Sequence, residues 1–339
     1  MTFRQPNPFD RFRRWQTVVF VAMLVFLVGC GAPIASVPPA PVASFPGNTD
    51  PPLLVDAAWL RDRLSQPGAD VRVLDLSPPR RYAEGHIPGA IHAWWQDAMD
   101  PYYPVYGVVL SNRNVSDARE RYLQQLGVSR ETVVVAYDND NNRHAARLVW
   151  TLRYFGHPDA SVLDGGLAAW KGLNVSISRD AGAVPDVPPV EIRPQPGVII
   201  GTRELRERHT DPSVVVLDIR SDEEARDDLN GSLRIGRIPG AVSVPWSATL
   251  RDNSGRLKSP DELAALFATA GVTPDREVVI YARFGVETAQ TWLVLSLLGY
   301  PNVRVYDQGW AEWASKLDLP IEPLILPAAV TPDKEAATG

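Results

Sequence analysis

Residues 278–292 read VVIYARFGVETAQTW and contain a short strand, a turn and the start of a helix. Three β-branched residues and Tyr281 form an apolar run of the kind found in buried strands. The turn Ala282-Arg283-Phe284-Gly285-Val286-Glu287 follows, and the helical pattern begins at Thr288. A strand that leads through a tight, glycine-containing turn into a helix N-terminus can hold an anion or a reactive nucleophile. Ala282, at the first turn position, has only a methyl group and can do no chemistry.

The same motifs occur twice along the chain in the same order, which indicates a duplicated domain. The first half contains VLDLS, EGHIPGA, TVVVAYD and DGGLAAW, beginning at residues 73, 84, 132 and 164. The second half contains VLDIR, IGRIPGA, EVVIYAR and DQGWAEW, beginning at residues 216, 235, 277 and 307. Tyr137-Asp138 in the first half therefore corresponds to Tyr281-Ala282 in the second.

Within each half, short apolar strands alternate with helical patterns. Residues 261–270 have apolar side chains at helical spacing, and Ser259-Pro260 supplies a capping hydroxyl and a first-turn proline. Residues 288–298 form another helical pattern that ends before Gly299. This alternation predicts an α/β fold with two tandem domains, each a mostly parallel sheet with helices on both faces. Such sheets bind ligands at the carboxyl ends of their strands, where Ala282 and Asp138 both lie.

The first 29 residues have the pattern of an export signal. Several arginines precede an apolar run over residues 17–28, which ends in Gly29-Cys30. The tetrad Leu27-Val28-Gly29-Cys30 resembles the bacterial lipobox, in which the cysteine is acylated. A plain membrane helix is the alternative, but the run is shorter than the ~20 residues that a span needs. We therefore expect an exported lipoprotein, anchored to a membrane of the bacterial cell envelope through Cys30.

Two proline-rich stretches divide the rest of the chain. Residues 30–52 form a tether, and residues 179–198 contain too many prolines for a helix and are predicted to be an extended linker. The two predicted domains occupy residues 53–178 and 199–318. Residues 319–339 form a C-terminal tail.

Composition excludes several classes of function. The formal net charge of −6 argues against a nucleic-acid binder. With Cys30 as the single cysteine, no internal disulfide and no thiolate metal site can form. The five histidines never form a close ligand pair such as His-x-x-x-His. Residues 138–142 begin like a calcium loop, but Arg143 replaces the glycine that such a loop needs, so we interpret them as a polar cap for the helix from His144. We expect neither a metal nor a cofactor.

Over about residues 53–318 these motifs resemble the tandem-domain rhodanese family, the thiosulfate sulfurtransferases. The resemblance is carried by the segments 85–90, 164–170, 216–223 and 291–303. It implies a structural first domain and a second domain with a cysteine at the start of the strand–loop–helix turn. In that family the thiolate takes the sulfane sulfur of thiosulfate as a persulfide and passes it to cyanide or another thiol.

The family loop begins Cys-Arg-x-Gly, whereas this loop begins Ala282-Arg283-Phe284-Gly285. A methyl group cannot carry a persulfide, so we expect the usual sulfur transfer to be lost. The first domain offers Asp138 at the equivalent position, a residue type that the family often has in its inactive half. Two further departures are Glu287, where related bacterial loops have an arginine, and Arg237, where the first repeat has His86.

The loop keeps features that could bind a small anion such as thiosulfate or sulfate, or a partner protein of the envelope. The candidate residues are Arg283, Phe284, Gly285, Val286, Glu287, Thr288 and Arg220. One alternative is that Glu287 or a neighbouring carboxylate fills the site. A separate alternative for Arg220 is a buried pair with a neighbouring acid such as Glu223 or Glu224. Two other functions stay open: a sulfurtransferase whose nucleophile comes from a partner protein, and a structural or interaction scaffold.

Overall fold

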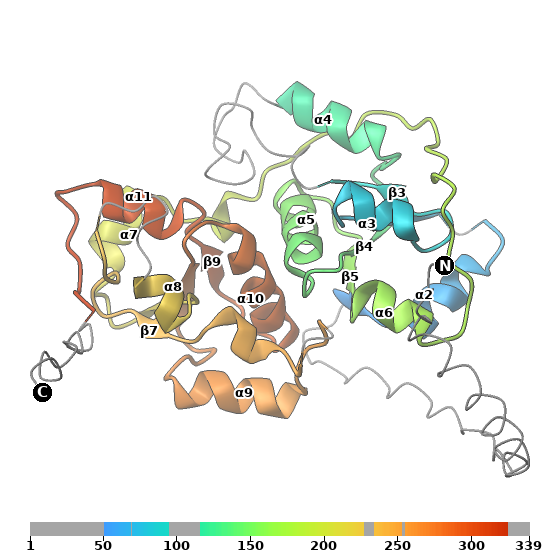
Figure 1. Ribbon diagram of the computed structural model, residues 1–339. Helices are drawn as coiled ribbons and strands as arrows, with labels where there is room; N and C mark the ends of the chain where they lie inside the picture. The colour runs from blue at the N-terminus through green and yellow to red at the C-terminus, as the bar shows by residue number, and fades with distance from the viewer. Residues whose placement is uncertain (1–50, 69, 95–115, 227–233, 253–254, 325–339) are drawn as a thin grey trace, which may run out of the picture. The chain divides into compact units, whose positions relative to one another are not determined.

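The computed structural model describes residues 51–68, 70–94, 116–226, 234–252 and 255–324 (Figure 1). The predicted export signal, Cys30, nearly all of the tether and the end of the C-terminal tail lie outside the described residues. Among the described helices, none has both the length and the apolar character needed to cross a bilayer.

The first half of the chain forms a five-stranded sheet whose strands are all parallel, in the order β1-β5-β4-β2-β3. Its strands are β1 (Leu54–Val55), β2 (Val71–Asp75), β3 (Ile91–His92), β4 (Val133–Tyr137) and β5 (Ala160–Leu163). Its helices are α2 (Ala57–Leu64), α3 (Pro79–Glu84), α4 (Ser116–Gln125), α5 (Arg143–Tyr154) and α6 (Gly166–Lys171).

The second half repeats this arrangement with a four-stranded parallel sheet in the order β7-β6-β8-β9. Its strands are β6 (Val214–Asp218), β7 (Val242–Ser243), β8 (Glu277–Tyr281) and β9 (Val303–Val305). Its helices are η4 (Pro196–Val198), α7 (Thr202–Arg208), α8 (Asp222–Arg226), η5 (Trp246–Thr249), α9 (Pro260–Thr269), α10 (Val286–Leu297) and α11 (Gly309–Ser315). Ile199 bridges to Val305 in parallel fashion, at the place that β1 takes beside β5.

Side chains of the central strands alternate between two cores, because successive residues of a strand point to opposite faces. On β4, Val134 and Ala136 pack into a core that contains α5, while Val135 and Tyr137 pack into a second core with residues of α2 and α6. The predicted sheet with helices on both faces is therefore confirmed, and the buried β-branched strands explain why it forms.

The duplication extends to individual contacts. Tyr137 is paired in register with Asp75, and Tyr281 with Asp218. The hydroxyl of Tyr137 accepts the N–H of Ile87 at 3.1 Å, and that of Tyr281 accepts the N–H of Ile238 at 3.3 Å. Because β4 and β8 make equivalent contacts, they occupy equivalent positions in the two domains. The loop that follows β4 is therefore the structural counterpart of the loop that follows β8.

The predicted helices at residues 261–270 and 288–298 are both present. Ser259 and Glu262 form a reciprocal capping box at the start of α9. The second helix, α10, begins at Val286 instead of Thr288, because Gly285 has right-handed φ and ψ angles of −76° and 0° that let the first turn begin earlier. Residues 181–195 contain neither helix nor strand. The boundaries assigned to the domains, tether, linker and tail stay predictions.

Helices α5 and α10 pack against each other and join the two halves. One continuous apolar core includes Trp150 on α5 and Leu293 on α10, together with residues of both sheets. The loops after β4 and β8 lie at the N-terminal ends of these two helices, so each loop is close to the opposite half of the molecule.

Candidate functional site

The carbonyl groups of the loop after β8 are held by neighbouring elements. The backbone N–H groups of Trp310 and Ala311, at the start of α11, donate to the carbonyl oxygens of Ala282 and Arg283 at 2.8 Å and 3.3 Å. The carbonyl of Gly285 accepts a hydrogen bond from Thr288 Oγ1 at 2.6 Å and one from Arg147 Nη1, on α5, at 2.8 Å. These contacts fix the orientation of the peptide planes that follow Ala282, Arg283 and Gly285.

In a trans peptide the C=O and the next N–H point in opposite directions. With the carbonyls turned toward α11 and α5, the N–H groups of Arg283 and Val286 point away from those helices. Within the described residues, neither of these N–H groups has a protein acceptor. In the first turn of α10, the backbone N–H of Glu287 is bonded to the carboxyl of its own side chain. The loop that begins at Ala282, a residue 3% exposed, therefore keeps the N–H groups of Arg283 and Val286 as donors without protein partners among the described residues.

A buried ion pair between the two halves supports Gly285. Arg147 Nη1 lies 2.6 Å from Oδ1 of Asp307, and the two residues are 3% and 7% exposed. Gly285 is required here for space, since a Cβ would lie 1.9 Å from that carboxylate oxygen and 2.9 Å from the guanidinium. Nε and Nη2 of Arg147 are buried and have no hydrogen-bond partner among the described residues.

Glu287 forms an ion pair with the opposite half of the molecule. Its Oε1 accepts a hydrogen bond from Arg143 Nη1, on α5, at 2.9 Å. Arg143 also bonds to Asp140 and stacks over the ring of Trp246. Burial raises the pKa of the Glu287 carboxyl, and the charge of Arg143 acts in the opposite direction. The carboxylate of Glu287 would repel an anion bound in the loop, but this repulsion is weakened because Arg143 compensates its negative charge.

Arg220 is buried behind the loop and already has partners. Its Nε and Nη2 donate to the two carboxylate oxygens of Asp218 at 3.0 Å and 2.8 Å, and Nη2 also donates to the carbonyl of Gly236. The guanidinium lies over the rings of Tyr281 and Trp310. The alternative of a buried pair with a neighbouring acid is confirmed, but the acid is Asp218, two residues before Arg220, and not Glu223 or Glu224. Arg220 is not presented as a free anion ligand.

The remaining candidate residues surround the loop in different ways. Arg283 is half-buried over the ring of Phe284, and its Nε and Nη2 have no hydrogen-bond partner among the described residues. Val286 is half-buried, whereas Thr288 is fully buried and uses its hydroxyl within the loop. Arg283 is therefore the cation of the predicted set that is left for a ligand.

Asp138, at the position equivalent to Ala282, places its own carboxylate into the first loop. Its Oδ1 accepts the backbone N–H groups of Asp140 and Asn142 at 2.7 Å and 2.9 Å, and its Oδ2 accepts that of Ala145 at 2.9 Å. Burial raises the pKa of this carboxyl, and the bond from Ala145 acts against that rise. The predicted cap of the helix is thus made by Asp138.

The two loops follow different backbone paths. Asn141 and Asn142 have left-handed φ angles of 58° and 63°, whereas no residue of the loop after β8 has a positive φ. Asn142 Nδ2 also donates across the domains to the carbonyl of Gly255 at 2.8 Å. The first loop is therefore wrapped around its own carboxylate, while the second is held by contacts from α11 and α5.

A family model for the rhodanese-like domain matches the chain twice, over residues 56–173 and 202–316. The chain belongs to the rhodanese-like family. It is 34% identical over 291 residues to the "sulfur carrier protein TtuD" of Thermus thermophilus, covering 81% of this chain and 98% of that protein. It is 32% identical over 271 residues to the thiosulfate sulfurtransferase of Azotobacter vinelandii, covering 80% and 97%.

A crystal structure of the 3-mercaptopyruvate sulfotransferase SseA from Escherichia coli is similar with a TM-score of 0.65 and 28% identity, covering 76% of this chain and 98% of that one. The match extends over both halves of the present protein. The tandem rhodanese fold expected from the sequence motifs is therefore confirmed.

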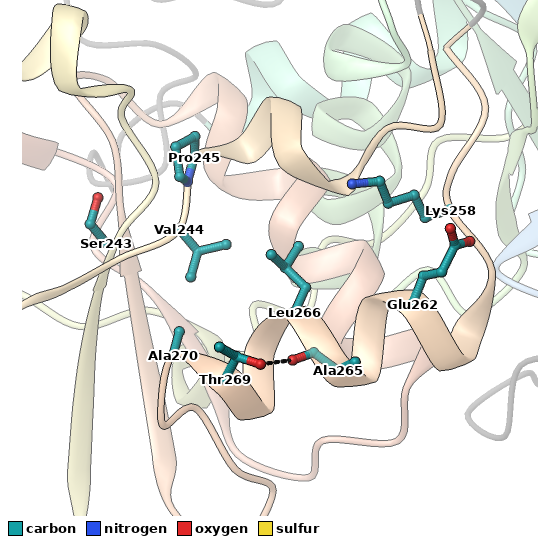
Figure 2. A pocket seen from close by; sticks show the side chains of 9 residues that line it. All are labelled: Ser243, Val244, Pro245, Lys258, Glu262, Ala265, Leu266, Thr269 and Ala270. Carbon is teal, nitrogen blue, oxygen red and sulfur yellow. Dashed lines mark hydrogen bonds between the residues drawn. The ribbon is translucent and has the colours of Figure 1, made fainter.

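A surface hollow of about 590 Å³ lies between the end of β7 and helix α9 (Figure 2), and its lining includes no residue of the loop after β8. Val244, Pro245 and Leu266 form much of its lining. Its charged groups are already engaged: Lys258 Nζ donates to the carbonyl of Ala248, and the carboxylate of Glu262 accepts from Ser259. The hollow offers no free reactive group, so the loop of this rhodanese-like protein stays the candidate site.

Arg147, Asp307 and Arg143 shape the site but are missing from the set expected from the sequence. Arg147 could have been identified from the sequence because it is the one charged residue in an otherwise apolar helical stretch, Ala145-Ala-Arg-Leu-Val149. Asp307 begins the motif that corresponds to Asp164 of the first half. Among the described residues, no group of His, Cys, Asp and Glu side chains is arranged to hold a metal ion.

Proposed function

We propose that this rhodanese-like protein binds a small oxyanion of the thiosulfate or sulfate type at the loop after β8, without forming a persulfide. The observation that carries the proposal is the orientation of the peptide planes after Ala282 and Gly285. Their carbonyls are engaged by α11 and α5, and the N–H groups of Arg283 and Val286 have no protein acceptor among the described residues, so these two donors are available to an anion beside Ala282. The side chain of Arg283, with Nε and Nη2 unpartnered, adds positive charge.

The first domain supports this proposal, because its loop already contains an anion. The carboxylate of Asp138 receives three backbone N–H groups there. The second loop has Ala282 at that position and brings no carboxylate of its own. A ligand from solution would take the corresponding place, although the two loops differ in backbone path.

Persulfide chemistry needs a thiolate, and Ala282 supplies none. The one cysteine of the chain, Cys30, belongs to the predicted lipid anchor. The relatives that are named sulfurtransferases support the family and leave open whether this chain has their activity. A nucleophile supplied by a partner protein is disfavoured, because Ala282 is 3% exposed and a foreign side chain would have to reach it.

We further propose that Cys30 is acylated and holds the two domains at a membrane of the bacterial envelope. The support for this part is the lipobox-like tetrad and the proline-rich tether. An anion-binding protein in that position could deliver its ligand to an envelope partner or report on its concentration. A purely structural role stays the competing proposal.

The test uses the full chain in mild detergent and titrates thiosulfate and sulfate by calorimetry at low ionic strength. We expect binding of both anions, and Arg283→Gln should weaken it about tenfold, because a charge-assisted hydrogen bond is worth about 1.5 kcal/mol or more. Arg203→Gln is the matched control, since Arg203 is an exposed arginine on α7 of the same domain. Equal loss in both variants, or no binding by the unaltered chain, would refute the proposal.

Activity is measured in parallel as sulfur transfer from thiosulfate to cyanide. We expect none from the unaltered chain and turnover from Ala282→Cys, which would show that the loop is intact and lacks only the nucleophile. Turnover by the unaltered chain would overturn the non-catalytic proposal. If both proteins are inactive and neither binds an anion, the scaffold role becomes the better explanation.

A further inference from the structure

We infer that Arg147 of the first domain is a positioning residue for the loop of the second domain. Its guanidinium, held by Asp307, fixes the Gly285 carbonyl and thereby aims the N–H of Val286 at the place beside Ala282. The inference rests on the proposed function, because it assigns the first domain a role in forming that anion site.

The geometry leaves Arg147 little freedom. One nitrogen, Nη1, contacts both the Gly285 carbonyl at 2.8 Å and Asp307 Oδ1 at 2.6 Å. The guanidinium also lies 4.6 Å from the ring centroid of Trp150 on its own helix. Because the cation is packed between a ring and a buried carboxylate, the Gly285 carbonyl cannot rotate without losing its hydrogen bond to Arg147.

The charges of the ion pair contribute little to the electrostatic potential that an anion in the loop would experience. Arg147 and Asp307 carry opposite charges and contact each other, so their potentials largely cancel at a distance. Any effect of the pair on an anion therefore comes mainly from the orientation of the peptide between Gly285 and Val286. Replacing Arg147 and Asp307 together therefore changes the orientation of this peptide while the net charge near the loop stays the same.

A second connection between the halves follows a related pattern. Asp164, which corresponds to Asp307, accepts the N–H of Leu257 from the second half at 3.3 Å. Each of the two equivalent aspartates thus reaches the opposite domain, but only Asp307 is linked to a loop whose N–H groups lack an internal carboxylate. The inference therefore concerns Arg147 and Asp307, with Asp164 as an internal comparison.

The experiment measures the thiol pKa of Ala282→Cys, from the pH dependence of alkylation by iodoacetamide in the full chain with Cys30→Ser. Inward N–H groups stabilise a thiolate, so we expect a pKa below the usual value of about 8.5. Adding Arg147→Met together with Asp307→Asn should raise that pKa by about one unit, which lowers the thiolate fraction, and with it the alkylation rate at pH 7, by up to about tenfold. This double replacement leaves no uncompensated buried charge.

The matched control is Arg153→Met, which removes an α5 arginine that bonds to Ala160 within the first domain; it should leave the thiol pKa unchanged. If the double replacement fails to fold, Arg147→Lys retains the charge balance. Its ammonium group should stay with Asp307, release the Gly285 carbonyl, and shift the pKa in the same direction.

The outcomes separate this inference from the proposed function. A lowered thiol pKa that does not respond to the double replacement, or to Arg147→Lys, overturns the positioning role and leaves anion binding intact. A response of the thiol pKa in a chain that binds no thiosulfate supports the positioning role and rejects the proposed function. A thiol pKa of about 8.5 in Ala282→Cys overturns both.

Discussion

Replacing Asp164 with asparagine should make the protein more stable at neutral pH. The carboxyl of Asp164 lies at the contact between the domains and accepts the N–H of Leu257 at 3.3 Å. Burial raises its pKa from 3.8 to about 6, against the opposing effects of the Leu257 N–H, Arg256 and Arg251, while Asp56 adds to the rise. Below about pH 4 the carboxyl is protonated in both the folded and the unfolded chain.

Between about pH 4 and 6 the folded state retains a proton that the unfolded state has released. The free energy of unfolding therefore falls as the pH rises through this range and stays lower above it. A shift of about two pKa units corresponds to roughly 3 kcal/mol, and partial access of water reduces this to about 1–3 kcal/mol. The asparagine in Asp164→Asn keeps an oxygen acceptor for Leu257 and has no charge, so it removes the cost at high pH.

The assay is urea unfolding of the full chain, followed by tryptophan fluorescence at pH 4 and pH 7.5. Asp164→Asn should raise the free energy of unfolding at pH 7.5 by about 1–3 kcal/mol and leave it nearly unchanged at pH 4. Asp62→Asn, at an exposed position on α2, serves as the control and should change little at either pH. Destabilisation by Asp164→Asn at pH 7.5, or an equal gain at both pH values, would refute the reasoning.

Two further substitutions test the loops. Gly285→Ala should destabilise the protein by about 3 kcal/mol or more, because its Cβ would force Asp307 and Arg147 apart, whereas Gly197→Ala meets no atom within 4 Å and should be nearly neutral. Equal urea midpoints for the two variants would contradict this steric explanation. Asp138→Ala should cost about 2–4 kcal/mol by leaving the N–H groups of Asp140, Asn142 and Ala145 without an acceptor, and added sulfate should restore part of the loss. If sulfate stabilised the unaltered chain to the same degree, this would argue against sulfate binding in place of the missing Asp138 carboxylate in the variant.

The sheets, the duplication and the helices at residues 260–269 and 286–297 could be predicted because their signals are local. Runs of β-branched residues mark the central strands, and Ser259-Pro260 marks a helix start within three residues. The motif order then places equivalent strands in equivalent positions. These features depend on short stretches of chain, so the sequence alone carries them.

The partners at the site could not be predicted as readily, because they depend on how distant elements pack. Arg147 and Asp307 are 160 residues apart and meet only because α5 packs against α10 next to the loop. The pairing of Arg220 with Asp218 was accessible in principle, since Asp218 ends β6 and Arg220 follows it by only two residues. The capping contacts of the Asp138 carboxylate could not be predicted, because they depend on the backbone conformation of its loop, in which two asparagines have left-handed φ angles.

The carboxylate of Asp138 acts as a tethered anion, and its binding to the first loop can be described by an effective concentration. Because it is covalently attached to the loop that it fills, its effective concentration there far exceeds that of any dissolved anion, which would compete at millimolar levels or below. The first loop therefore keeps its own carboxylate whichever anions are dissolved around the protein. The loop of the first domain does not exchange its anion with solvent, so the structure of that domain stays constant. A change of anions around the protein would therefore alter only the loop of the second domain.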